Sequence, residues 1–133
     1  MHTARTLPAT PESVRQARDL VTVALLDVPC TPPTIEVARL LVSELATHAV
    51  TTSQAPTFTV EVAVEDHTAR VVVQDADPGG TPGAAGSHPT AESGFWLLER
   101  LASRWWWDEH TDWPGKTIGF ELPCHEGLLP PLA

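Results

Sequence analysis

Residues 43–50 read Ser-Glu-Leu-Ala-Thr-His-Ala-Val and lie in a segment, Thr34–Thr52, that we predict to be a helix. Apolar side chains recur along this segment at intervals of three and four residues, as in a helix packed on a core. Glu44 and His48 are four residues apart and are therefore neighbours on the helix surface, on a partly apolar edge. Three interpretations stay open: a base with its partner, two ligands of a metal ion, or a simple surface pair.

The segments around this helix predict the other elements. A first helix is expected at Thr10–Val28, with Thr10 or Ser13 as its cap. After the second helix the apolar residues alternate, which predicts two strands of a hairpin with a turn at residues 66–68. The strands are Thr57–Glu65 and Ala69–Asp75. Beyond them we expect a long mobile loop rich in Gly and Pro, a third helix, a second antiparallel pair and an irregular tail: Ala76–Ser93, Gly94–Arg104, Trp105–Glu109 with Lys116–Leu122, and Pro123–Ala133.

This order of elements is typical of an α/β (α+β) fold: a two-layer sandwich with helices on one face of a mixed, mostly antiparallel sheet. The chain has 133 residues, which favours a single domain over residues 1–133, with an ordered core at about 10–122. Hydrophobic residues make up 42% of it, too many for a disordered chain.

Charge and composition narrow the function classes. The net charge of −9 disfavours direct nucleic-acid binding, because an acidic surface repels phosphates. We find no signal peptide and no apolar run that approaches the length of a membrane span, so a soluble cytoplasmic protein is expected. Cys30 and Cys124 fit no metal spacing. Two reduced thiols are the simpler expectation for them, and one bridge is the alternative.

A second informative stretch, Val71-Val72-Val73-Gln74-Asp75-Ala76-Asp77-Pro78-Gly79-Gly80, ends the hairpin. Asp75 shares its parity with Val71 and Val73, so its carboxylate is expected on the core side of the strand. A carboxylate there accepts hydrogen bonds from buried donors, and the amino group of adenine is a suitable one. The alternative is an Asp that caps the following turn.

Two further stretches offer weaker signals. Gly94 opens the third helix after the long loop, so backbone N–H groups there are available to a phosphate, although Ser-Gly often begins a helix without any function. Thr117 in the last strand offers a hydroxyl to a ligand, although most strand threonines are simply good strand formers.

Taken together in this order, the four stretches resemble the GHKL superfamily of ATPases, which includes the histidine kinases and gyrase. Within it, the chain looks like the stand-alone anti-sigma-factor serine kinases of bacteria. SELATHAV resembles the N-box, VVVQDADPGG the G1 box, ESGFWLLERLASRW a worn G2 box, and GKTIGFEL the closing strand. The resemblance covers about Pro11 to Leu122 and implies a Bergerat-type ATP-binding fold.

The resemblance also implies roles for single residues. Glu44 would be the general base that activates a serine hydroxyl or a water, and residues 76–93 would form the lid over ATP or ADP with Mg²⁺. The residues that would bind the nucleotide are His48, Asp75, Asp77, Gly94, Phe95 and Thr117. The implied partner is a sigma factor or an anti-sigma-factor antagonist, and a homodimer is a further expectation.

Departures from the family pattern favour an alternative function. The N-box Asn that holds Mg²⁺ in the family is His48 here, and a neutral imidazole is a poor ligand for this hard ion. Glu92 would add negative charge near the phosphates. The alternative is therefore a non-catalytic member that binds proteins and has weak or no nucleotide binding.

Two hypotheses concern the histidine itself. In the first, an imidazolium at His48 pairs with Glu44 and makes this carboxylate a weaker base. In the second, Glu44 and His48 bind a metal ion of the softer kind, with His67 or His88 as a further ligand.

Five tryptophans are unusual in so short a chain. Strand alternation places Trp105 and Trp107 on one face and Trp106 on the other. At least one of these indoles is expected to be exposed and to anchor an interface. The alternative is that loops or the proline-bearing tail cover it.

Overall fold

The computed structural model describes residues 1–52, 54–75, 95–109 and 115–125. Within these ranges one five-stranded sheet has the order β1-β2-β3-β5-β4, and every neighbouring pair is antiparallel. The strands are β1 His2–Pro8, β2 Thr57–Glu65, β3 Thr68–Asp75, β4 Arg104–Glu109 and β5 Lys116–Pro123. The α+β class is confirmed, with the described sheet wholly antiparallel rather than mixed.

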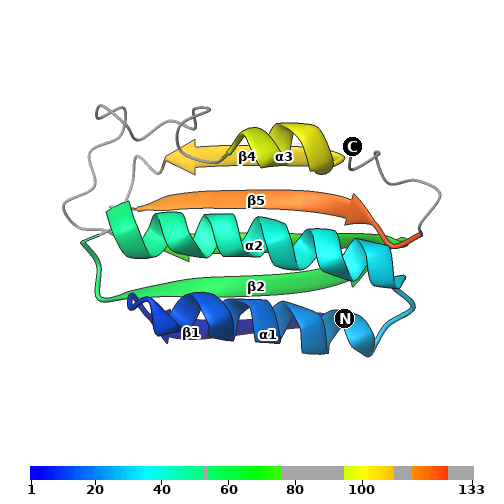
Figure 1. Ribbon diagram of the computed structural model, residues 1–133, viewed down its shortest axis with the longest axis horizontal. Helices are drawn as coiled ribbons and strands as arrows, with labels where there is room; N and C mark the ends of the chain where they lie inside the picture. Colours follow the sequence, from blue (N-terminus) through cyan, green and yellow to red (C-terminus); the bar gives the residue numbers. More distant parts are fainter. Residues whose placement is uncertain (53, 76–94, 110–114, 126–133) are drawn as a thin grey trace.

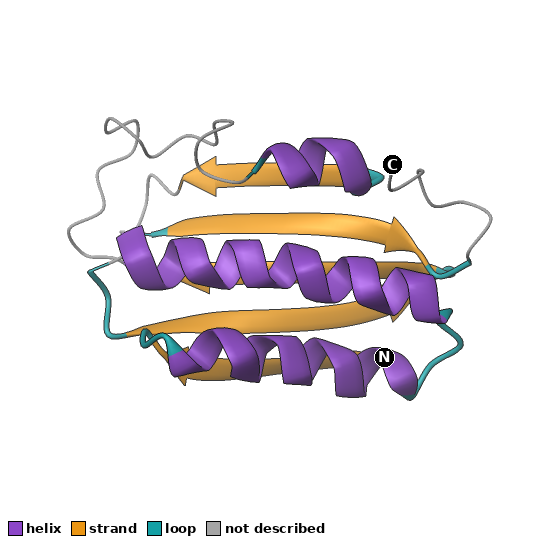
Figure 2. Cartoon of the chain, viewed as in Figure 1, coloured by secondary structure: helices purple, strands orange, loops and turns teal. Residues whose placement is uncertain are grey.

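Two long helices, α1 Glu12–Leu26 and α2 Pro32–Thr52, cover one face of the sheet, and the short α3 Trp96–Leu101 lies beside β4 (Figures 1 and 2). The predicted stripe of α2 is buried, as Leu45 and Val42 show. The strands alternate against it, with the inward residues of β2, β3 and β5 forming the sheet side of the core: Phe58, Val60, Val62, Val71, Val73, Ile118, Phe120 and Leu122. None of the described helices is long and apolar enough to cross a membrane.

The structure differs from the predicted elements in several places, including the ends of the first two helices, since α1 ends at Leu26 and α2 begins at Pro32. β1 was not expected, and it pairs along β2 as an edge strand. The N-cap of α1 is Pro11, which makes no side-chain cap, whereas Thr10 and Ser13 bond each other through their hydroxyls at 3.3 Å. α3 is shorter than predicted because Arg104 already belongs to β4. The predicted loop, residues 76–93, and most of the tail lie outside the described residues.

Candidate functional site

Asp75 ends β3 with its side chain on the core face, as the alternation predicts. It is 3% exposed, and its Oδ2 atom lies 3.0 Å from Nζ of Lys116, which faces it across the register of β3 and β5. The ammonium side chain is only 13% exposed. Charge neutralisation by this partner explains how an ionised carboxylate is buried at the end of a strand. Sequence analysis missed Lys116, although it shares the parity of the buried Ile118 and Phe120.

His48 lies near this ion pair on the last turns of α2. Its ring is buried and packs against Phe95 and Trp107, with centroid distances of 4.9 and 5.3 Å. Its Nε2 atom is buried and has no hydrogen-bond partner among the described residues. Burial, reinforced by the positive charge of Lys116, lowers the pKa of His48 to about 4. The imidazole is therefore neutral at physiological pH.

Glu44 lies one helical turn before His48 and is half-buried. Its pKa is raised by burial, which makes it a stronger base than an exposed carboxylate. The ion pairs of the described residues do not include one between Glu44 and His48. The hypothesis that an imidazolium quenches Glu44 is therefore wrong: the imidazole is neutral, and the pKa of the carboxyl moves in the opposite direction.

The donor atoms here do not fit a hard divalent cation. Among the described residues, no three His, Cys, Asp or Glu side chains are grouped so that they could hold a metal ion. A neutral, aromatic-packed imidazole in place of an oxygen ligand is also unsuited to Mg²⁺. His67, a proposed further ligand, lies in the β2–β3 turn, at the end of β3 opposite Asp75. His88 lies outside the described residues.

The remaining predicted residues are only partly brought to this site. Phe95 is 2% exposed and contacts His48 through its ring, a contact that sequence analysis did not foresee. Thr117 pairs in register with Gln74, on the face of the sheet opposite Asp75. The resemblance implied that Thr117 binds the nucleotide near Asp75; the two residues lie at the same end of the sheet, but their side chains are on opposite faces. Asp77 and Gly94 lie outside the described residues.

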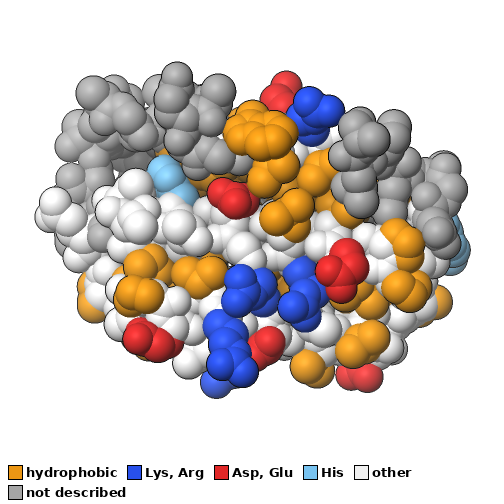
Figure 3. Space-filling view, in the orientation of Figure 1, with side chains coloured by type: hydrophobic (Ala, Val, Ile, Leu, Met, Phe, Trp, Pro, Cys, Tyr) orange, Lys and Arg blue, Asp and Glu red, His pale blue; other side chains and the backbone are white. Residues whose placement is uncertain are grey.

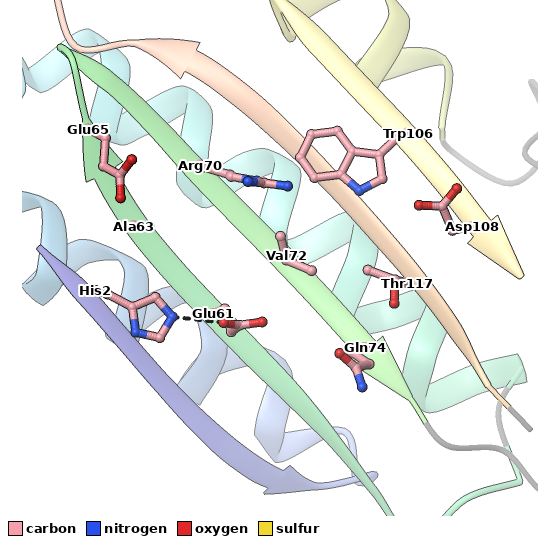
Figure 4. A pocket seen from close by; sticks show the side chains of 10 residues that line it. All are labelled: His2, Glu61, Ala63, Glu65, Arg70, Val72, Gln74, Trp106, Asp108 and Thr117. Atoms are coloured by element: carbon pink, nitrogen blue, oxygen red, sulfur yellow. Dashed lines mark hydrogen bonds and ion pairs between the residues drawn. The ribbon is translucent and has the colours of Figure 1, made fainter. Parts of the chain in front are cut away.

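A hollow of about 430 Å³ lies on the helix-free face of the sheet (Figure 4). Thr117, Trp106 and Arg70 are among its lining residues. The predicted division of the three adjacent tryptophans is confirmed: Trp105 and Trp107 pack on the core, and Trp106 lies on the outer face. Trp106 is half-buried beneath the guanidinium groups of Arg70 and Arg104, at 4.8 and 5.1 Å from its ring centroid.

A family model and a solved structure match this chain. Residues 7–118 match the model of the histidine kinase-like ATPase domain, so the chain belongs to that family. Among solved structures it is similar to the crystal structure of the RsbU and RsbW domains of Rv1364c from Mycobacterium tuberculosis, with a TM-score of 0.72 and 20% identity over 98% of this chain. This chain spans 33% of that longer one. No curated protein matches it.

Proposed function

We propose that this protein is an adenine-nucleotide-binding regulator resembling the anti-sigma-factor kinases, and that it acts by binding a sigma factor or an anti-sigma-factor antagonist. The observation that carries the nucleotide-binding proposal is the buried carboxylate of Asp75 at the end of β3, within a histidine kinase-like ATPase domain. A carboxylate has about four acceptor positions, so it can receive an adenine amino group while it holds Lys116.

In this proposal, Asp75 selects adenine and Glu44 acts as the base toward a hydroxyl of the partner. The raised pKa of Glu44 suits this role, because a base is most effective when its pKa is close to the working pH. The buried Nε2 atom of His48, which has no hydrogen-bond partner among the described residues, would pair with a polar group of the nucleotide. Mg²⁺ is given no role, because the described donor atoms do not fit it.

The partner would contact the surface formed by α1 and α2. Arginines gather over these helices in an otherwise acidic chain (Figure 3): Arg15, Arg18 and Arg39. Large apolar side chains lie exposed on the same helices: Val23 at 62%, Leu26 at 66% and Leu40 at 42%. A surface of this mixed apolar and basic kind suits a protein partner with an acidic, partly apolar face.

A second function, a non-catalytic binding module, is favoured by one observation. His48 is neutral and enclosed by Phe95 and Trp107, so aromatic packing occupies the position where the family places a metal ligand. This arrangement suits binding without turnover.

Calorimetric titration with ATP, in the presence and in the absence of Mg²⁺, tests the first proposal. We expect ATP to bind with nearly the same affinity under both conditions. If no binding is found at millimolar ATP, the proposal of nucleotide binding is wrong, and the non-catalytic protein-binding module becomes the favoured function.

Partner binding is tested separately with purified sigma factors and antagonist proteins from the source organism. Val23→Asp should weaken the complex, whereas Glu65→Gln, on the opposite face of the sheet, should leave it unchanged. Equal binding by both variants would place the partner elsewhere.

A further inference from the structure

The two cysteines, 94 positions apart in the sequence, meet in the structure. Cys30 lies between α1 and α2 and is half-exposed, whereas Cys124 directly follows β5 and is buried. Both are free thiols, and their Sγ atoms are 2.6 Å apart. A disulfide needs about 2.05 Å between sulfur atoms, so a movement of about 0.5 Å brings them to bonding distance.

The backbone on each side of this pair is already fixed. Thr31 N donates to the carbonyl of Cys124 at 3.1 Å, and Cys124 N donates to the carbonyl of His67 at 2.8 Å. The hydroxyl of Thr34 donates to the carbonyl of Pro123 at 2.9 Å. The segments before α2 and after β5 are therefore tied together by hydrogen bonds whether or not a covalent bond is present.

We propose that Cys30 and Cys124 form a reversible disulfide that joins the start of α2 to the end of β5. The oxidant is a low-molecular-weight disulfide such as oxidised glutathione. Cys30, the more accessible thiol, attacks it: a mixed disulfide forms and one small thiol leaves with a proton. Cys124 then attacks the Cys30 sulfur, so that the protein disulfide forms and the second small thiol leaves. Two protein thiols are oxidised and one small disulfide is reduced to two thiols.

The chemistry of the site predicts that this reaction is slow at neutral pH. Burial, together with the neighbouring Cys124, raises the pKa of Cys30 to about 12. The thiolate is the attacking species, so the rate should rise about tenfold per pH unit below that pKa. The described residues offer no third ligand that would turn the two thiols into a metal site.

The bond would act on stability and leave the nucleotide site alone. The thiols lie just before α2 and directly after β5, whereas His48 is near the end of α2 and Lys116 begins β5 (Figure 1). The disulfide closes a long loop, which restricts the unfolded chain strongly. The inference does not depend on the proposed function.

The test uses the full chain, incubated with mixtures of reduced and oxidised glutathione at pH 8. Free thiols, intact mass and melting temperature are measured for the native protein and for Cys30→Ser and Cys124→Ser. We expect loss of both thiols, a mass lower by two hydrogen atoms, and a melting temperature raised by about 10 °C or more. Reduction with dithiothreitol should reverse all three changes, and neither variant should show them.

Three results would overturn the proposal. The native thiols could stay titratable in oxidised glutathione, the reaction could stop at a stable glutathione adduct on Cys30, or the product could be a dimer linked between chains. The comparison of oxidised with reduced native protein needs no variant, so a serine variant that fails to fold does not weaken the test. ATP titration of the two native forms should give equal affinities, and a change in affinity on oxidation would contradict the separation of the two sites.

Discussion

Asp75 Oδ2 lies 3.0 Å from Lys116 Nζ, in a pair of which both side chains are largely withdrawn from water. Such a pair is not in itself strong evidence for stability, because desolvation of the two charges offsets their attraction. Removal of one partner, however, leaves an uncompensated buried charge. The carboxylate proposed to recognise adenine is therefore held in place by an ammonium group of the same chain.

Lys116→Met tests the energetic role of this pair. We expect the free energy of unfolding to fall by about 3–5 kcal/mol, because Asp75 is left buried without its counter-charge. Urea denaturation measures the change. The double variant with Asp75→Asn should recover much of the loss, since it buries no charge at that position. If Lys116→Met has the same free energy of unfolding as the native protein, Lys116 does not compensate the buried charge of Asp75.

Asp75→Asn tests the proposed adenine contact. The amide presents an N–H₂ group in place of one carboxylate oxygen, which mismatches a buried donor and should weaken ATP binding by about 1–3 kcal/mol. Thr117→Val is the matched control, because Thr117 lies on the other face of the sheet. Calorimetry should find its ATP affinity unchanged. Equal affinity of Asp75→Asn and the native protein would mean that Asp75 does not contact the nucleotide.

The sequence predicted those elements whose apolar residues recur regularly. The stripe of α2 and the alternation of β2 and β3 are visible in the chain because each buries a whole face. β1 was missed because it is an edge strand that buries only Leu7, so no alternation of apolar residues marks it. The caps of α1 were misassigned because Thr10 and Ser13 bond each other, and neither side chain caps the helix.

The site was predicted in part. The parity of Asp75 with Val71 and Val73 placed its carboxylate correctly, since alternation is a local property. The same rule applied to β5 places Lys116 inward and Thr117 outward, whereas the family resemblance implied the threonine as a nucleotide ligand. The aromatic packing of Phe95 around His48 depends on long-range contacts that no spacing in the sequence encodes.

Gly119→Ala tests the packing of the outer sheet face. A Cβ atom at Gly119 would lie 2.2 Å from Cζ2 of Trp106, whose ring covers this glycine from the neighbouring strand. The indole must move, and the contacts of its ring with Arg70 and Arg104 must be remade, so we expect a loss of about 1–3 kcal/mol. Thermal unfolding measures it. The double variant Gly119→Ala with Trp106→Ala should be as stable as Trp106→Ala alone. A further loss of stability would show that the added Cβ atom does not act through the Trp106 ring.

His48 predicts a dependence of stability on pH. Its pKa is lowered from 6.5 to about 4 in the folded protein, so the unfolded chain takes up a proton first as the pH falls. The contribution of the neutral His48 to the free energy of unfolding is fully present above about pH 6.5. It is lost as the pH falls toward 4, and the loss is about 3 kcal/mol at most. Glu44, whose pKa is raised, acts in the opposite direction in the acidic range.

The measurement is the free energy of unfolding between pH 7 and pH 4, for the native protein and for His48→Phe. The variant keeps an aromatic ring beside Phe95 and Trp107 but has no titrating group, so its stability should fall less over this range. Identical pH profiles would show that His48 is not buried as a neutral imidazole. Lys116→Met should also raise the pKa of His48, followed by NMR titration, because the charge of Lys116 contributes to the lowering.

His48→Asn tests why this chain departs from the Mg²⁺ chemistry that its family resemblance implies. An amide oxygen is a hard ligand of the kind that Mg²⁺ prefers, whereas the neutral imidazole is not. We expect the native protein to bind ATP with little dependence on Mg²⁺, and the variant to bind it more tightly when Mg²⁺ is present. His48→Leu is the control, because it removes the imidazole without supplying an oxygen ligand. Calorimetry with and without Mg²⁺ separates the three proteins. A native protein that already requires Mg²⁺ for ATP binding, and loses this requirement in His48→Asn, would show that the imidazole itself supports the metal.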